Sequence, residues 1–181
     1  QAILDSVAEA PRYAETSVTT LTEQVAAREG VPPACVMIGT GSGELLRVAA
    51  LLAATTRPGS ELVAAKPTYE ELPEFAGRMG LAVQWVASDA AHRHDLVAMR
   101  AAVGDRTSLV YVCNPNNPTG TVVGRDALEK FVRSVPATVT VLVDEAYIDF
   151  VDATDAGTVA GLTQQVPNLV VLRTFSKLHG L

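Results

Sequence analysis

The two residues best suited to chemistry, Asp144 and Lys177, each follow a strongly apolar run. Asp144 comes after Thr-Val-Thr-Val-Leu-Val at 138–143. A carboxylate buried there without a partner is costly, so it should face a cation or an N–H group; a helix N-cap is the plainer alternative. Lys177 follows a second apolar run and the hydroxyls of Thr174 and Ser176. The amine of a partly buried lysine can attack a carbonyl and form a Schiff base, whereas an exposed surface lysine is the alternative.

A rigid, amide-rich segment, Cys-Asn-Pro-Asn-Asn-Pro-Thr-Gly at 113–120, follows another apolar run. Pro115 and Pro118 fix two backbone angles and remove two N–H donors, while Gly120 permits a turn. A plain turn needs one such residue rather than this density. The segment is therefore predicted to hold the amide of Asn117 rigidly at the edge of a sheet.

Two further candidates lie earlier in the chain. Gly41 and Gly43 flank Ser42 just before a predicted helix, so free N–H groups and the positive helix end could bind a phosphate. A tight turn with a serine cap is the alternative. Tyr69 stands near another helix start, where its ring could lie over a planar ligand, or it could be a half-buried core tyrosine.

The elements that must position these residues alternate between strand-length apolar runs and helix-length amphipathic stretches. Apolar runs without polar alternation predict an α/β fold, with a mostly parallel sheet and helices on both faces. In such sheets ligands bind at the carboxyl ends of the strands, which is where the candidate residues lie. Strands are predicted at 35–39, 61–65, 81–87, 107–113, 138–146 and 168–175, and helices at 17–29, 43–56, 68–80, 95–103, 124–135 and 157–165.

Composition narrows the class of protein. Apolar residues make up 48% and charged residues 19% of the 181 positions, which is ordinary for a globular chain. A net charge of −6 and a pI near 5.0 disfavour a nucleic-acid or anionic-membrane partner. Cys35 and Cys113 are interpreted as buried free thiols in a reducing compartment. No apolar run reaches the roughly 20 residues of a membrane span and no signal peptide is visible, so a cytoplasmic location is expected.

The candidate residues together describe one ligand. It has a phosphate, a flat aromatic ring, a ring nitrogen that a carboxylate keeps protonated, a phenolic oxygen bound by an amide or hydroxyl, and an aldehyde that an amine captures. That ligand is pyridoxal 5′-phosphate.

Five segments carry a resemblance to a known family. They are Gly-Ser-Gly-Glu-Leu-Leu (41–46), Lys-Pro-Thr-Tyr-Glu-Glu (66–71), Asn-Pro-Asn-Asn-Pro-Thr-Gly (114–120), Val-Asp-Glu-Ala-Tyr-Ile-Asp-Phe (143–150) and Thr-Phe-Ser-Lys-Leu-His-Gly-Leu (174–181). In order and spacing they resemble the fold-type I pyridoxal-phosphate enzymes of the class I/II aminotransferase superfamily. The chain is most similar to the histidinol-phosphate aminotransferase branch.

The resemblance implies a role for each candidate residue. It makes Lys177 the catalytic lysine that binds the cofactor covalently, and Asp144 the partner of the ring nitrogen. It assigns the phenolic oxygen to Asn117 and Tyr147, and ring stacking to Tyr69. The phosphate would be held by Ser42, Gly43, Thr174 and Ser176, and by Tyr13 reaching into the neighbouring subunit of a homodimer. Two departures from the family pattern are Ala14, where the family has proline, and Gly43, where an aspartate is commoner.

The resemblance also implies an aminotransferase acting on an amino acid or amino-alcohol phosphate and a 2-oxo acid, with histidinol phosphate favoured. The family's members are roughly twice as long, so residues 1–181 are interpreted as most of the large cofactor-binding domain, without the N-terminal arm and the C-terminal small domain. Two alternatives stay open: a decarboxylase of the threonine-phosphate type, and a truncated, non-catalytic cofactor-binding module. A nucleotide-binding domain is disfavoured, because neither glycine-rich nucleotide motif is present. His92 and His94 have a metal-like spacing but no visible third ligand, so no metal is expected.

Overall fold

The computed structural model describes residue 7, residues 15–152 and residues 157–181. The chain divides into two units, residues 1–38 and 39–181. The described part of the first unit contains helix α2 (Glu15–Glu29) and the short 3-10 helix η2 (Pro33–Cys35), which contact each other. Gly30 follows α2 with a φ of 68°, a left-handed conformation that glycine adopts readily and that commonly ends helices.

One predicted strand, 35–39, is wrong. Cys35 ends η2, and the residues after it form an extended segment outside the sheet. Met37 is 69% exposed and Cys35 is exposed as well. A short apolar run forms a stable strand only if it pairs with a neighbour and buries its side chains, and this one does neither. Both cysteines are free, but only Cys113 is buried as predicted.

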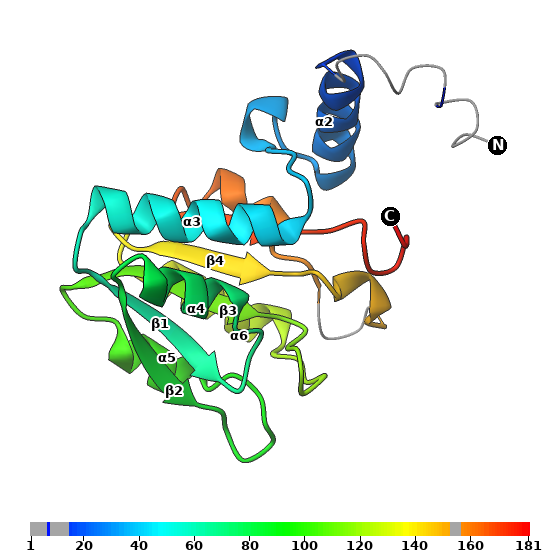
Figure 1. Cartoon of the computed structure of the whole chain (residues 1–181). Coiled ribbons are helices and arrows are strands. Elements are labelled where there is room, and N and C mark those ends of the chain that lie inside the picture. Colours follow the sequence, from blue (N-terminus) through cyan, green and yellow to red (C-terminus); the bar gives the residue numbers. More distant parts are fainter. Residues whose placement is uncertain (1–6, 8–14, 153–156) are drawn as a thin grey trace. The chain divides into compact units, whose positions relative to one another are not determined.

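The second unit is built on a five-stranded sheet (Figure 1). Its strands are β1 (Glu61–Lys66), β2 (Ala82–Ala87), β3 (Thr107–Cys113), β4 (Thr140–Asp144) and β5 (Leu169–Leu172). The order is β2-β1-β3-β4-β5, and every neighbouring pair is parallel. This confirms the predicted α/β fold with a parallel sheet.

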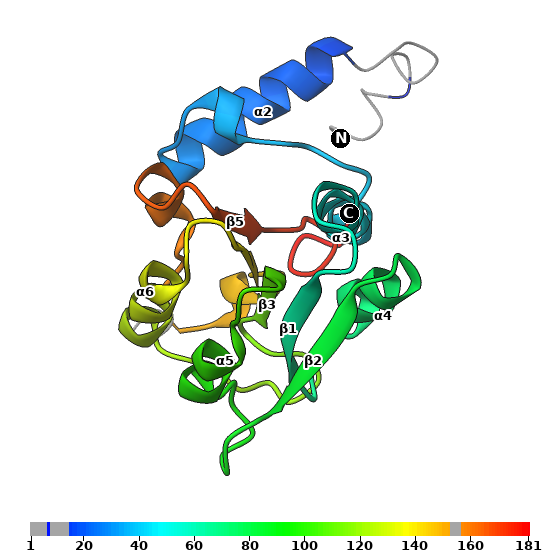
Figure 2. The same cartoon turned by 90° about the vertical axis from the view of Figure 1, so that its left-hand side faces the viewer.

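Helices cover both faces of this sheet (Figure 2). The helices are α3 (Ser42–Thr56), α4 (Glu71–Arg78), α5 (Leu96–Ala102) and α6 (Arg125–Ser134), with 3-10 helices η3 (Ile148–Phe150) and η4 (Ala160–Gln164). Alternate residues of each central strand enter two separate clusters: Val110 and Val112 of β3 pack with α5 and α6, whereas Leu109 and Tyr111 pack with α3 and α4. This two-sided burial explains why the strands are almost wholly apolar.

The strand order reverses between β1 and β3. From β1 the chain goes to β2 on one side, and it then crosses back to place β3 on the other side of β1. In open parallel sheets the crevice at such a switch point, outside the carboxyl ends of the strands, is where ligands bind. The segments that follow β1 and β3 are 66–71 and 114–120, two of the segments singled out in the sequence.

Two of the predicted helices differ from those in the structure. The helix predicted at 68–80 begins only at Glu71, so Tyr69 lies in the loop before it, and Pro73 falls in the first turn, where its missing N–H costs nothing. The helix predicted around 157–165 is a 3-10 helix, Ala160–Gln164. Among the described residues, no helix is long and apolar enough to cross a membrane.

Candidate cofactor site

Asp144 is a buried ionisable group at the carboxyl edge of the sheet. It is the last residue of β4 and is 3% exposed. Tyr111 donates its hydroxyl to Oδ2 at 3.0 Å, and the Ala146 N–H donates to Oδ1 at 3.1 Å. Burial raises the pKa of Asp144, while these two hydrogen bonds and the charge of Lys177 act in the opposite direction. A carboxylate held in this way is suited to a cationic N–H partner.

Lys177 is close enough to Asp144 for its charge to lower the pKa of that carboxyl. Its Nζ lies 5.2 Å from the centre of the Tyr147 ring, within the range of a cation–π contact. The side chain of Lys177 is exposed, so the expectation of a partly buried lysine is wrong for the described chain. It follows β5 on a loop and lacks the covering that a helix or strand would give.

Tyr69 lies in the same area. Its hydroxyl donates to Glu71 Oε2 at 2.6 Å, and this bond is the main reason that its pKa is raised to about 12. Asp144 and Tyr147 also raise the pKa through their charges, which places Tyr69 near both. Tyr69 as a whole is 37% exposed. The residue is therefore accessible to a planar ligand, rather than buried in the core.

Asn117 is half-buried on the loop after β3. The amide of the neighbouring Asn116 holds this loop: its Nδ2 donates to the Pro67 carbonyl at 3.1 Å and to Thr119 Oγ1 at 2.8 Å. Thr68 donates to Asn116 Oδ1 at 2.9 Å. These bonds join the loop after β1 to the loop after β3 and fix the backbone that presents Asn117.

A pocket of about 360 Å³ opens beside Asn117 and Tyr147. Its remaining lining is mostly apolar and comes from the loop after β3 and from the region of η3. The lining residues are Pro115, Asn116, Asn117, Pro118, Gly120, Val122, Tyr147, Phe150 and Val151.

The predicted phosphate residues lie on two segments. Ser42 and Gly43 open α3, whose N-cap Gly41 has a φ of 102° and makes no side-chain capping bond. Thr174 and Ser176 share a hydrogen bond of 2.7 Å between their hydroxyls. In both views the segment after β5 passes beside the first turn of α3 (Figures 1 and 2). Free N–H groups and hydroxyls there suit an anion.

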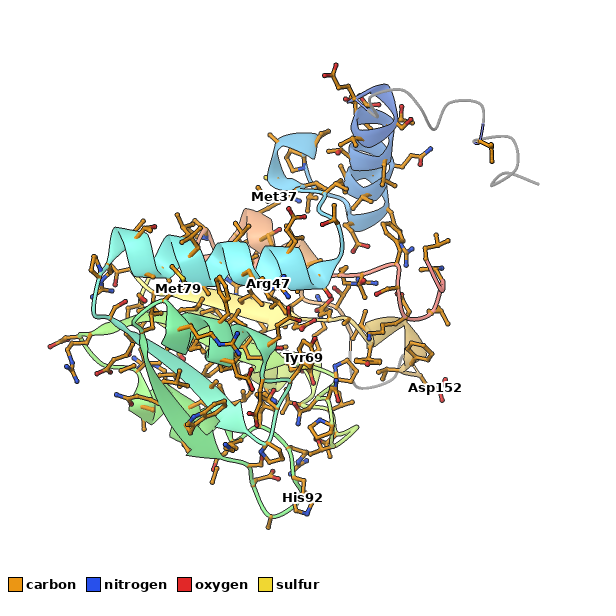
Figure 3. The ribbon with its side chains drawn as sticks, viewed as in Figure 1. Met37, Arg47, Tyr69, Met79, His92 and Asp152 are labelled. Carbon is orange, nitrogen blue, oxygen red and sulfur yellow. The ribbon has the colours of Figure 1, made fainter. Side chains whose placement is uncertain are left out.

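Sequence reasoning missed two residues that touch the candidate side chains, Tyr111 on Asp144 and Glu71 on Tyr69. It also missed Arg47, labelled in Figure 3, which binds Glu71 at 2.7 Å. Tyr111 could have been found from strand periodicity, because it points to the same face of the sheet as Asp144. Tyr13 lies outside the described residues, so its role and the shared-site homodimer stay predictions.

The two histidines of the His-Arg-His segment do not form a pair. His94 is buried and its Nε2 lies 3.0 Å from Asn116 Oδ1, whereas His92 lies at the far end of the loop (Figure 3). Within the described ranges, no group of three histidine, cysteine, aspartate or glutamate side chains is arranged to hold a metal ion.

The parallel sheet, the buried Asp144 and the nearby Lys177 define the class of protein: an α/β domain built to hold a charged aromatic cofactor at the ends of its strands. Residues 8–181 match the family described as "Aminotransferase class I and II". The chain belongs to this family, whose members depend on pyridoxal phosphate.

Individual relatives point to two activities. The chain is 44% identical to a histidinol-phosphate aminotransferase of Moorella thermoacetica over 93% of its own length and 43% of that protein. It is 43% identical to an aromatic amino acid aminotransferase of Thermobifida fusca over 100% of its length and 50% of that protein. The crystal structure of the Sinorhizobium meliloti histidinol-phosphate aminotransferase in complex with pyridoxal-5′-phosphate superposes with a TM-score of 0.87, at 27% identity, over 99% of this chain and 48% of that one. The chain therefore spans about half the length of the relatives it matches.

The residues present fit pyridoxal phosphate. A buried, doubly hydrogen-bonded carboxylate faces a primary amine, a tyrosine ring with an open face lies beside them, and a helix start without a side-chain cap borders the same region. This donor set matches the ring nitrogen, aldehyde, ring and phosphate of the cofactor.

Proposed function

We propose that this chain is the cofactor-binding part of a pyridoxal-phosphate-dependent aminotransferase, which transfers an amino group between an amino donor and a 2-oxo acid. The observation that carries the proposal is the cluster of Asp144, Lys177 and Tyr69 at the carboxyl edge of the sheet. A buried acid at the end of a strand, and an amine and an aromatic ring on two loops, together match one cofactor.

When bound, pyridoxal phosphate supplies an aldehyde and an electron-withdrawing ring that stabilises negative charge on an adjacent carbon. Asp144 is placed to accept a hydrogen bond from a protonated ring nitrogen and so to hold the proton there. Tyr69 offers its ring face to the cofactor, and Asn117 and Tyr147 offer an amide and a hydroxyl to the phenolic oxygen. The amine of Lys177 can bind the aldehyde, and once released it can carry a proton as a general base and acid.

For the amino donor, we propose histidinol phosphate, supported by the similarity to the Moorella and Sinorhizobium proteins. Aromatic amino acids are the second candidate, supported by the similarity to the Thermobifida protein. The pocket beside Asn117 has an apolar lining that includes Phe150 and Val151, and such a lining can pack against the flat ring that each of these donors carries.

The test begins with a visible absorption titration of the full-length protein with pyridoxal phosphate, followed by borohydride reduction and peptide mapping. We expect covalent labelling of Lys177, no labelling in Lys177→Ala, and a loss of transamination of at least about 10³-fold in that variant. Ordinary turnover in Lys177→Ala would refute the assignment. A comparison of kcat/KM for histidinol phosphate and phenylalanine then decides between the two donors.

A further inference from the structure

The carboxylate of Glu71 joins two elements at the edge of the candidate site. Glu71 is the first residue of α4. Its Oε2 accepts the hydroxyl of Tyr69 at 2.6 Å, and its Oε1 accepts Nη2 of Arg47, on α3, at 2.7 Å. The two bonds use different oxygens, so a single carboxylate holds the tip of the Tyr69 ring and is itself held from α3.

The Glu71 carboxylate lies directly against Gly43. A Cβ added at Gly43 would lie 2.9 Å from Glu71 Oε1 and 3.2 Å from Oε2, so the end of the Glu71 side chain would have to shift. The φ of Gly43 is not in the left-handed range, so the backbone does not require glycine there. A side chain at position 43 would instead act on the site by moving the neighbouring Glu71 carboxylate.

Restraint of Tyr69 matters because its ring is partly exposed and would otherwise sample several rotamers. A ring that is already fixed loses less conformational entropy when a planar ligand binds against it. The negative charge of Glu71 lies close enough to Asp144 to affect it, which places the carboxylate at the site rather than on a remote surface. Its side chain is 23% exposed, compared with 59% for Arg47.

We propose that Glu71, anchored by Arg47, is a positioning residue that fixes the ring of Tyr69 against the cofactor, and that the glycine at position 43 leaves its carboxylate in the place where it holds Tyr69. This inference rests on the proposed function for the identity of the ligand. The contact between Glu71 and Tyr69 can be tested without any ligand.

The first experiment measures the ionisation of Tyr69 in the cofactor-free, full-length protein, by NMR of tyrosine labelled with ¹³C at Cζ. The variant Tyr69→Phe assigns the resonance. Between pH 8 and 11 we expect Tyr69 to remain mostly protonated in the parent protein, because its pKa is raised to about 12. In Glu71→Gln the midpoint should move down toward the ordinary value of about 10.

The second experiment measures the dissociation constant of pyridoxal phosphate by absorption. We expect it to increase about tenfold in Glu71→Gln, because Tyr69 loses its charged hydrogen-bond acceptor. Gly43→Ala should lower the Tyr69 midpoint in the same way, since its methyl group displaces the carboxylate. The dissociation constant of the double variant Gly43→Ala/Glu71→Gln should be no higher than that of either single variant. Such non-additivity is expected when two changes act on one contact.

Glu74→Gln is the matched control: Glu74 lies on the same helix and pairs with Arg78 at the surface, so neither measurement should change. An unchanged Tyr69 midpoint in Glu71→Gln would overturn the proposal, and so would a shifted midpoint with unchanged cofactor affinity. If the parent protein itself binds no pyridoxal phosphate, the proposed function fails, and the positioning role fails with it even where the titration shows the contact.

Discussion

At the scale of single residues, Asp144 shows how a buried charge is made tolerable. It lies on the face of the sheet that packs against α3 and α4, beside Cys113 of the neighbouring strand. Two donors, the Tyr111 hydroxyl and the Ala146 N–H, compensate part of the desolvation. Burial still dominates, since the pKa of Asp144 remains raised. The carboxylate therefore retains an affinity for a further positive partner.

Tyr111→Phe should destabilise the protein by an amount that depends on pH. Because the pKa of Asp144 is raised in the folded protein, ionisation of Asp144 opposes folding. This cost in unfolding free energy is absent below the pKa of the unfolded chain, about 4, and fully present above the pKa of the folded protein. Removing the Tyr111 donor raises that pKa further. We expect a loss of about 2 kcal/mol at pH 7 and about half of that at pH 4, measured by urea unfolding.

The double variant Tyr111→Phe/Asp144→Asn supplies the control for this prediction. The unfolding free energy of the double variant is compared with that of Asp144→Asn alone. Without the carboxylate, the difference between these two proteins should no longer vary between pH 4 and pH 7. A variation that persisted in the double variant would mean that the titrating group is not Asp144.

At the scale of elements, Asn116 connects three of the loops that follow the strands. Asn116 accepts from Thr68, contacts His94, and donates to Pro67 and Thr119. It therefore ties together the segments that follow β1, β2 and β3. A buried network in which nearly every group is paired gives a loop one conformation.

Asn116→Ala should cost about 3 kcal/mol of unfolding free energy, because it leaves the Thr68 hydroxyl and the Pro67 carbonyl without their buried partner. We also expect faster hydrogen exchange in the segments 66–71 and 114–121, while β4 keeps its protection. Thr121→Ala, at the more exposed end of the same loop, is the comparison variant, since its hydroxyl bonds to Thr119 and to the His92 carbonyl only. Equal effects of the two variants would argue against a central role for Asn116.

His94→Gln should make the protein less sensitive to acid. Burial lowers the pKa of His94 from 6.5, so the neutral imidazole stabilises the fold fully above about pH 6.5, and this contribution is lost as the pH falls below that value. Glutamine can keep an N–H bond to Asn116 without titrating. The loss of unfolding free energy between pH 7 and pH 5 should be smaller in the variant by about 1 kcal/mol. An identical loss in both proteins would exclude His94 as the group that titrates.

The sequence predicted most elements because they are long and periodic. The apolar runs at 61–65 and 107–113 could only be buried strands, and both are found within a residue of the predicted ends. The run at 35–39 looked alike, but strand formation depends on a neighbour that no local pattern reveals. Among the site residues, Asp144 and Asn117 could be predicted because each one follows an apolar, strand-like run. Glu71 and Arg47 act only through contacts between elements, so their roles could not be read from either segment alone.

At the scale of the whole second unit, one sheet separates two apolar clusters. Leu46 of α3 packs on one face and Leu128 of α6 on the other, and both are fully buried. The central strands contribute alternate side chains to both clusters, so neither cluster can form without the strands that the other one also needs. The two faces should therefore unfold together.

Leu46→Ala and Leu128→Ala should each reduce the unfolding free energy by about 3 kcal/mol. Because the two sites lie on opposite faces and share no contact, the double variant should show the sum of the two losses in a single transition. Fluorescence and circular dichroism should give the same midpoint in every variant. Two separate transitions in either single variant would show that the faces are independent.

The close approach between Gly43 and Glu71 limits how this site can change over generations. A side chain gained at position 43 requires the Glu71 carboxylate to shift. A shorter residue at 71 removes the need for this shift, but it also leaves Arg47 and Tyr69 without their shared acceptor. The order of substitutions at positions 43 and 71 therefore matters, because the effect of each one depends on whether the other has already occurred. The effect of a substitution at either position therefore depends on the residue present at the other.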